Sequence, residues 1–231
     1  ALFITGTGTD VGKTFVTGLI VKKLQENRKK AAYYKAAMSG NERCMDHHLI
    51  PGDAQYVKDI SGILQPLEEM CPYIYEQAFS PHLASRIEGN PVCMDVVCQG
   101  FHKVCEQYDY ITMEGSGGIL CPIRYDNTKL FLTDIIEELS LSSLLIADAG
   151  LGTINSVVLT VEYMRAHNLP VKGIIFNHFH PGNIMEEDNL HMCESLTGLK
   201  VLACVQDHDT DLSMDAKLLA SLYPNVEGGT R

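Results

Sequence analysis

A glycine-rich segment near the start of the chain, Gly6-Thr7-Gly8-Thr9-Asp10-Val11-Gly12-Lys13-Thr14, constrains the fold more than any other feature. The apolar run Leu2–Thr5 comes directly before it, and an amphipathic stretch typical of a helix begins at Lys13. Where a strand turns through glycines into a helix, backbone N–H groups surround phosphate oxygens, and the helix N-terminus adds a partial positive charge. A purely structural glycine corner explains Gly-Lys-Thr at the helix start poorly. The segment therefore predicts a binding site for ATP and Mg²⁺.

The spacing within this loop departs from the strict phosphate-loop pattern. Five residues, rather than four, separate Gly6 from Gly12, and Thr7 stands where the first glycine is expected. The end of the loop keeps the lysine and the threonine that contact phosphate and metal in this motif. We expect Lys13 to reach the β- and γ-phosphates and the Thr14 hydroxyl to ligate Mg²⁺.

The crown of the loop consists of Thr9 and Asp10. We expect both to face the gap where a second substrate meets the phosphates. An acid that merely favours the start of a helix is the alternative interpretation of Asp10. The extra residue and this crown favour a loop that shares its space with a small substrate over one that only hydrolyses nucleotide.

Short apolar runs alternate with amphipathic stretches along the whole chain. This alternation predicts a parallel sheet with helices on both faces. We expect one α/β domain of the P-loop NTPase type over residues 1–224 and a tail over 225–231. Residues 40–92 are the least periodic, and we expect loops and short helices there that shape a site. The expected strands are Leu2–Thr5, Ala31–Tyr34, Tyr110–Met113, Leu144–Ala147, Lys172–Phe176 and Lys200–Val205. The expected helices are Lys13–Asn27, Met94–Glu106, Leu132–Leu139, Thr153–His167, Met185–Leu196 and Met214–Leu222.

Charge and cysteine content narrow the classes of partner. The formal net charge of −11 repels nucleic acid phosphates and anionic membranes, so we expect neither as a partner. No apolar stretch is long enough to span a bilayer, and no signal-peptide pattern is present, so we expect a cytoplasmic protein. The eight cysteines form no C-x-x-C pair. Reduced thiols are therefore a better explanation than a zinc site.

Several further segments, in order along the chain, resemble those of dethiobiotin synthetases, the ATP-dependent carboxylases of biotin synthesis. Each later segment is a weak signal alone, but their ordered combination is specific and covers essentially the whole chain. The segments are Gly6–Thr14, Tyr34–Gly40, Gly52–Ala54, Ser80–Ala84, Glu114–Gly118, Gly152–Asn155 and Phe176–Asn177. In Tyr34–Gly40, Ala36 replaces the family's proline.

The resemblance implies a reaction that joins CO₂ to 7,8-diaminononanoate. One amine captures CO₂, or bicarbonate as its source, as a carbamate, whose oxygen attacks the γ-phosphorus of ATP. The second amine then closes the ureido ring and expels phosphate. No covalent enzyme intermediate is needed, so positioning and charge neutralisation must carry the catalysis. The family also implies a homodimer.

Cations and carboxylates suit these steps. Thr14, Asp53 and Glu114 offer hard oxygen ligands for Mg²⁺, and Glu114 is expected just after an apolar strand. Lys35 is expected after the second strand, where its charge would stabilise the carbamate and the transferred phosphoryl group. A turn residue is the alternative for Asp53, and a solvated lysine the alternative for Lys35. We take Lys35, Lys13 and Thr9 as the catalytic group.

Other roles follow from the resemblance alone. Ser39 and Gly118 are expected to bind the diamine, and Asn177 with His178 the adenine, with a strand cap as the alternative for Asn177. Backbone N–H groups near Gly152, Thr153 and Asn155 would hold the substrate carboxylate across the dimer interface. The remaining expected nucleotide contacts are Asp10, Val11, Gly12, Lys13, Thr14, Phe15, Asp53, Glu114, Gly115, Ser116 and Gly117.

Three other interpretations fit the sequence less well. A cobyrinate-type amidase shares the loop, but 231 residues leave no room for its glutaminase region. A partner-regulated switch ATPase normally carries an extra lysine at the start of the loop, where Thr5-Gly6-Thr7 has none. An inactive ATP-binding homologue is kept open by Ala36.

Overall fold

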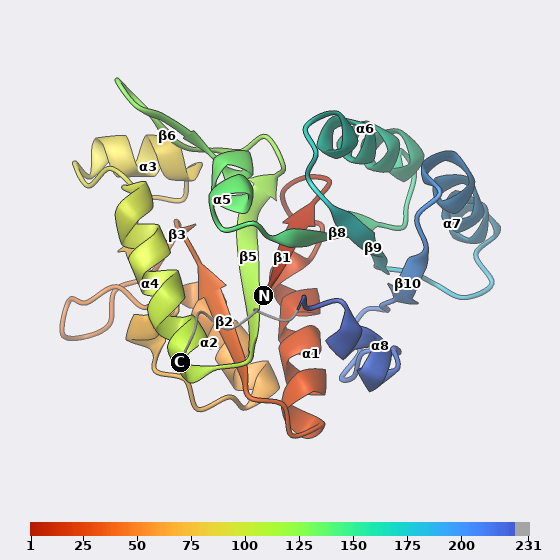
Figure 1. Ribbon diagram of the computed structural model, residues 1–231, viewed down its shortest axis with the longest axis horizontal. Coiled ribbons are helices and arrows are strands. Elements are labelled where there is room, and N and C mark those ends of the chain that lie inside the picture. The colour runs from red at the N-terminus through yellow and green to blue at the C-terminus, as the bar shows by residue number, and fades with distance from the viewer. Residues whose placement is uncertain (225–231) are drawn as a thin grey trace.

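The computed structural model describes residues 1–224, so the predicted tail at 225–231 lies outside the described residues. Its centre is a six-stranded sheet in the order β10-β9-β8-β1-β5-β2, in which every neighbouring pair is parallel (Figure 1). The strands are β1 (Leu2–Gly6), β2 (Ala31–Lys35), β5 (Tyr110–Gly118), β8 (Ser142–Asp148), β9 (Val171–Asn177) and β10 (Val201–Cys204). The predicted α/β fold is confirmed.

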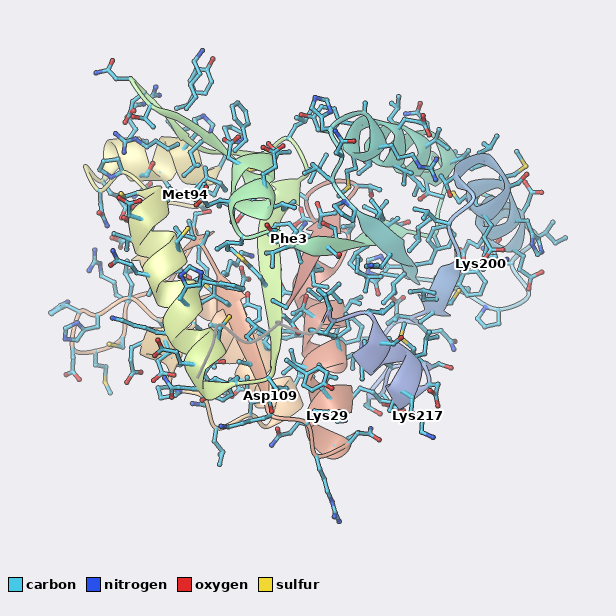
Figure 2. All side chains as sticks on the ribbon, viewed as in Figure 1. Phe3, Lys29, Met94, Asp109, Lys200 and Lys217 are labelled. Carbon is cyan, nitrogen blue, oxygen red and sulfur yellow. The ribbon has the colours of Figure 1, made fainter. Side chains whose placement is uncertain are left out.

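Helices cover both faces of this sheet because its strands are apolar on both sides. Leu2 and Ile4 belong to the core on the face of α1 (Lys13–Glu26), α2 (Gly52–Ser61) and α8 (Ala216–Ser221). Phe3 points to the opposite core, and Figure 2 places it at the centre of the molecule. That second face is covered by α4 (Met94–Gln107), α5 (Leu132–Glu138), α6 (Thr153–Ala166) and α7 (Ile184–Thr197).

Smaller elements border the carboxyl end of the sheet. Helix α3 (Pro81–Ile87) lies against the antiparallel pair β6 (Pro122–Tyr125) and β7 (Lys129–Phe131). Strands β3 (Ala37–Met38) and β4 (Tyr73–Ile74) form a second short sheet, and Leu67–Glu69 is a 3₁₀ helix. No helix within residues 1–224 combines the length and the apolar character needed to cross a bilayer.

The sequence placed most elements to within two residues, with one difference that matters for the site. The strand expected at Tyr110–Met113 continues to Gly118, so Glu114 lies inside β5 rather than after it. Strand β5 is held between β1 and β2, and Ile4 and Lys35 are its register partners at Glu114. Residues 40–92 contain the expected short helices α2 and α3, but also β4, which pairs with β3 just before this segment. Neither of these two strands was predicted.

Candidate active site

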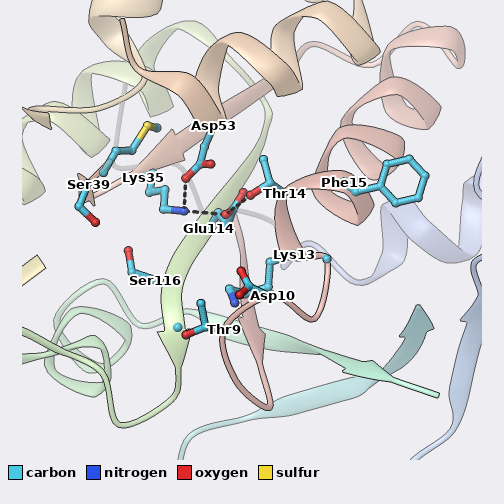
Figure 3. Close-up of a pocket in the computed structure, with 13 residues that line it drawn as sticks. Thr9, Asp10, Lys13, Thr14, Phe15, Lys35, Ser39, Asp53, Glu114 and Ser116 are labelled. Atoms are coloured by element: carbon cyan, nitrogen blue, oxygen red, sulfur yellow. Dashed lines mark hydrogen bonds and ion pairs between the residues drawn. The ribbon is translucent and has the colours of Figure 1, made fainter. Parts of the chain in front are cut away.

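A pocket of about 440 Å³ opens at the carboxyl ends of β1 and β2, beside β5 (Figure 3). This edge is where parallel α/β sheets usually bind ligands, because loops and helix N-termini converge there. The pocket is lined by Thr9, Asp10, Gly12, Lys13, Thr14, Phe15, Lys35, Met38, Ser39, Asp53, Glu114, Ser116 and Gly117. Most residues predicted for the reacting end of the substrates therefore share one cavity.

The glycine-rich loop reaches helix α1 through a left-handed residue. Gly12 has φ +82 and caps α1, whose first residue is Lys13. A Cβ atom at Gly12 would lie 2.0 Å from Nδ2 of Asn177. Asp10, at the crown, also has a positive φ of 60. Glycine at position 12 thus meets both a conformational and a steric requirement.

Lys13 is folded back onto its own loop. Its Nζ donates a hydrogen bond to the carbonyl oxygen of Gly8 at 2.7 Å. Burial, followed by the positive charge of Lys35, lowers the pKa of Lys13 from its ordinary value. The Lys13 ammonium group is therefore held beside the loop. A nearby anion such as phosphate would stabilise its positive charge there.

Lys35, Asp53 and Glu114 form an ion cluster at the base of the pocket (Figure 3). Nζ of Lys35 lies 2.6 Å from Oδ2 of Asp53 and 2.7 Å from Oε1 of Glu114. The hydroxyl of Thr14 donates to the same Glu114 oxygen at 2.9 Å. Lys35 is the last residue of β2 rather than the first after it, which places it directly beside Glu114 in the sheet register.

The protonation of this cluster follows from its charges. Burial alone would lower the pKa of Lys35, but Glu114 and Asp53 outweigh burial and raise that pKa above its ordinary value. Burial would raise the pKa of Asp53, yet the charge and hydrogen bond of Lys35 hold it below its ordinary value. Both directions favour a charged Lys35–Asp53 pair.

The donors at this point suit a hard divalent cation. Thr14, Asp53 and Glu114 bring one hydroxyl and two carboxylates to one place, and oxygen ligands of this kind are those that Mg²⁺ takes. The Lys35 ammonium group lies between the two carboxylates. Asp53 reaches the cluster from the first turn of α2, where an acid is favoured by the helix dipole.

Tyr33 belongs to this cluster and was not among the predicted site residues. It is fully buried, and its hydroxyl donates to Oε2 of Glu114 at 3.1 Å. Tyr34, the tyrosine of the quoted motif, points to the opposite face and donates to the carbonyl of Val97. This contact could have been predicted from the sequence. Side chains alternate between the two faces of a strand, so Tyr33 and Lys35 must lie on the same face.

The remaining pocket residues surround this cluster. Ser39 and Ser116 are partly exposed in the pocket lining, and Ser116 donates to the carbonyl of Ala37 at 3.1 Å. Val11, Gly115 and Gly118 do not belong to the lining. Gly118, for example, lies beside the backbone of the glycine-rich loop.

Asn177 and His178 lie behind the glycine-rich loop, outside the pocket lining. The Asn177 side chain is fully buried and donates to the carbonyl of Val11 at 3.2 Å. Its Oδ1 has no hydrogen-bond partner among the described residues. His178 is half-buried, with Nδ1 2.7 Å from a carboxylate oxygen of Asp148 at the end of β8. The pair therefore connects the loop to β8 and β9.

Gly152, Thr153 and Asn155 lie at the N-terminus of α6, also outside the pocket lining. Gly152 caps the helix with φ 93, and Gly152 and Asn155 are exposed. The Thr153 hydroxyl is buried and unpartnered within residues 1–224. The structure thus does not bring these three residues together with Lys35 and Ser39 in a single cavity of one chain.

Comparison with known families gives a consistent assignment. A family model described as an AAA domain matches residues 1–213. The ATP-dependent dethiobiotin synthetase BioD of Brachyspira hyodysenteriae is 50% identical over 224 residues, covering 96% of this chain and 98% of the relative. The enzyme of the same name from Clostridium botulinum is 44% identical over 222 residues, covering 96% and 97%.

Solved structures share the fold at low sequence identity. The MinC:MinD cell division protein complex of Aquifex aeolicus matches with a TM-score of 0.56 and 13% identity, over 90% of this chain and 81% of that chain. A ParA family ATPase of Chlorobium tepidum matches with a TM-score of 0.53 and 13% identity, over 90% and 84%. At such identity the likeness describes the fold alone.

Proposed function

This chain belongs to the ATP-dependent dethiobiotin synthetase family, and we propose that it is a cyclo-ligase that forms dethiobiotin from 7,8-diaminononanoate, CO₂ and ATP in biotin biosynthesis. ADP and phosphate are the other products. The observation that carries the proposal is the pocket that joins the loop residue Lys13 to the Lys35–Asp53–Glu114 cluster. A loop built only to bind nucleotide does not need a second cation at the base of its pocket.

The residues of the pocket suit each step of this reaction. An amine of the substrate bonds to CO₂ and loses a proton, which gives a carbamate next to Thr9 and Ser39. The carbamate oxygen attacks the γ-phosphorus, and ADP leaves. Lys13 and Lys35 lie in the same pocket lining, where they offset the negative charge of the transferred phosphoryl group. The second amine then attacks the carbonyl carbon, closes the ring and expels phosphate.

Thr14, Asp53 and Glu114 would hold Mg²⁺ with the ATP phosphates. When bound, Mg²⁺ neutralises charge on the β- and γ-phosphates. The same carboxylates hold the Lys35 ammonium group. Metal and lysine would therefore share the two carboxylates, which would place both positive charges beside the transferred phosphoryl group.

Asn177 and His178 are proposed to contact the nucleotide base. The unpartnered Oδ1 of Asn177 supports this role, because a buried amide oxygen without a partner is costly. It lies directly against the loop that holds the phosphates. The base would have to reach it from the side of His178, which is half-buried.

The substrate carboxylate is proposed to bind at the N-terminus of α6 in a second copy of the chain. Gly152 and Asn155 lie outside the pocket of their own chain, while the exposed helix N-terminus suits an anion. Apolar side chains are exposed nearby on α6, on α7 and in the loop before α6, as an interface would require. They are Leu151, Leu159, Ile184, Met192 and Leu196. This arrangement supports the proposed homodimer.

A cytoplasmic location remains a prediction. It is supported by the eight cysteines, all of which are unpaired within residues 1–224. Free thiols are usual in reducing compartments.

Phosphate release from ATP tests the function. We expect purified protein to form phosphate only when the diamine, bicarbonate and Mg²⁺ are all present, and to yield the cyclic urea in equal amount. Rapid phosphate release without diamine would favour a switch ATPase instead. ATP binding without turnover under any of these conditions would show an inactive homologue.

A further inference from the structure

The two carboxylate oxygens of Glu114 have different partners. Oε1 accepts hydrogen bonds from Thr14 at 2.9 Å and from Lys35 at 2.7 Å, on the side of the pocket. Oε2 accepts from the Tyr33 hydroxyl at 3.1 Å, on the side of the core. Glu114 itself is 1% exposed. Its carboxylate therefore presents one oxygen to the pocket and keeps the other in the protein interior.

Tyr33 is held rigidly enough to fix this orientation. It lies on β2, the edge strand of the sheet, whose outer backbone groups are bound by other parts of the chain. The Gln65 side chain accepts from the Tyr33 N–H at 2.8 Å and donates to the Tyr33 carbonyl at 3.0 Å. Two positions on, the Lys35 N–H donates to the Met70 carbonyl at 2.8 Å. The strand cannot shift without losing these buried hydrogen bonds.

The Tyr33 phenol acts as the donor in this contact, because a carboxylate oxygen can only accept. A hydrogen bond from a neutral phenol to a carboxylate is charge-assisted and stronger than one between neutral groups. Oε2 is thus engaged continuously, and a cation bound on the pocket side can use only Oε1.

We propose that Tyr33 is a positioning residue that makes Glu114 a one-oxygen ligand and so favours Mg²⁺ over Ca²⁺. This inference rests on the proposed metal site. Ca²⁺ takes six to eight oxygens and often binds a carboxylate through both of them, whereas Mg²⁺ requires octahedral geometry and keeps several waters. Holding Oε2 in the core denies the second oxygen to the larger ion and costs the smaller ion nothing.

The test measures cation preference rather than turnover. Mg²⁺ and Ca²⁺ are titrated separately by calorimetry into the protein with a non-hydrolysable ATP analogue, for the wild type and for Tyr33→Phe. The substitution removes only the hydroxyl. We expect the ratio of the Ca²⁺ dissociation constant to that of Mg²⁺ to fall about tenfold, the effect of losing one hydrogen bond to a charged group. Ca²⁺ should become a correspondingly stronger inhibitor of turnover, with the KM for the diamine unchanged.

Tyr34→Phe is the matched control. Tyr34 is equally buried on the same strand, but its hydroxyl donates to the Val97 carbonyl at 2.8 Å. Both variants lose one buried hydrogen bond, so both should melt at a lower temperature than the wild type. Only Tyr33→Phe should change the cation ratio.

Two outcomes would overturn the inference. A cation ratio in folded Tyr33→Phe within twofold of the wild type, with the wild type requiring a divalent cation, would show that Tyr33 only fills the core. A wild type that binds the analogue equally well without either cation would remove the metal site, and this inference with it.

Discussion

The two sides of the sheet around β1 are prepared to different degrees. On the β5 and β2 side, Lys35, Asp53 and Glu114 are paired at 2.6 and 2.7 Å in the lining of one pocket. On the β8 and β9 side, the residues expected to bind the base and the substrate carboxylate lie outside that pocket, and two of their buried polar atoms lack partners within the described residues. The residues proposed for phosphoryl transfer share one pocket of a single chain, whereas those proposed for the base and the substrate carboxylate lie outside it.

This contrast suggests that the two sides of the sheet serve different purposes, one catalysis and the other the selection of ligands. A preorganised ion cluster stabilises developing charge without rearrangement at the moment of reaction. Contacts that form only with ligand or partner let the enzyme select what it acts on before the chemistry begins. Substitutions on the two sides should therefore fail in different ways.

The largest expected effect comes from removing the Lys35 ammonium group. We expect Lys35→Ala to lower kcat about 10²–10³-fold while ATP binding is retained, because the variant loses charge stabilisation of the transferred group. Single-turnover phosphate release and ATP-analogue titration measure the two quantities. Lys30→Ala, at an exposed lysine just before the same strand, serves as the control. Turnover in Lys35→Ala equal to that of the control would show that another group supplies the catalytic charge.

The next largest effect is expected at Gly12, where the glycine-rich loop meets Asn177 on the β9 side. Gly12 has φ +82, and a Cβ atom added there would lie 2.0 Å from the Asn177 side chain. Gly62 has a similar φ of +70, but a Cβ atom added there would meet nothing within 4 Å. We expect Gly12→Ala to lower the free energy of unfolding by about 3 kcal/mol and Gly62→Ala by about 1 kcal/mol, since overpacking adds to backbone strain only at Gly12. Urea unfolding measures both. Equal losses would mean that Asn177 moves aside freely and that the two sides are not coupled there.

A smaller effect should follow from a charge on the exposed apolar surface of α7. Ile184 is 84% exposed. If it lies at the proposed dimer interface, Ile184→Asp should separate the two copies and lower turnover about tenfold. ATP binding should not change. Analytical ultracentrifugation and steady-state kinetics report the two effects, with Met45→Asp, at a residue 98% exposed on the other side, as the control. A variant that stays dimeric and fully active would place the interface elsewhere.

The smallest effect concerns His180 on the β9 side. The hydrogen bond and charge of Glu186 raise the pKa of His180 above its ordinary value. Because the folded pKa is the higher one, this pair stabilises the fold fully below about pH 6.5, the unfolded value, and the contribution is lost as pH rises through the folded pKa. NMR titration of the ring protons should show the raised pKa in the wild type and a lower one in Glu186→Gln. Identical titrations would assign the shift to another group.

Features that depend on local spacing follow from the amino-acid sequence alone. The Gly6–Thr14 loop, the strand before it and the helix after it are specified by neighbouring residues, so they could be predicted with their boundaries. Alternating apolar and amphipathic runs sufficed for the α/β fold, because each run reports its own burial. Ordered motifs also named Lys35 as a catalytic residue and Asp53 and Glu114 as metal ligands, although not that the three side chains touch.

How distant residues meet depends on the fold of the whole chain. Lys35 and Glu114 are 79 positions apart, and their contact follows from the register between β2 and β5, which packing of the whole sheet sets. The same register places Tyr33 beside Glu114, and β5 continues through the glycines. Gly152–Asn155 lie outside the pocket of their own chain. Local patterns fix which side chains share a face of a strand, but they do not say which strand lies beside it or which residues face each other across the pair.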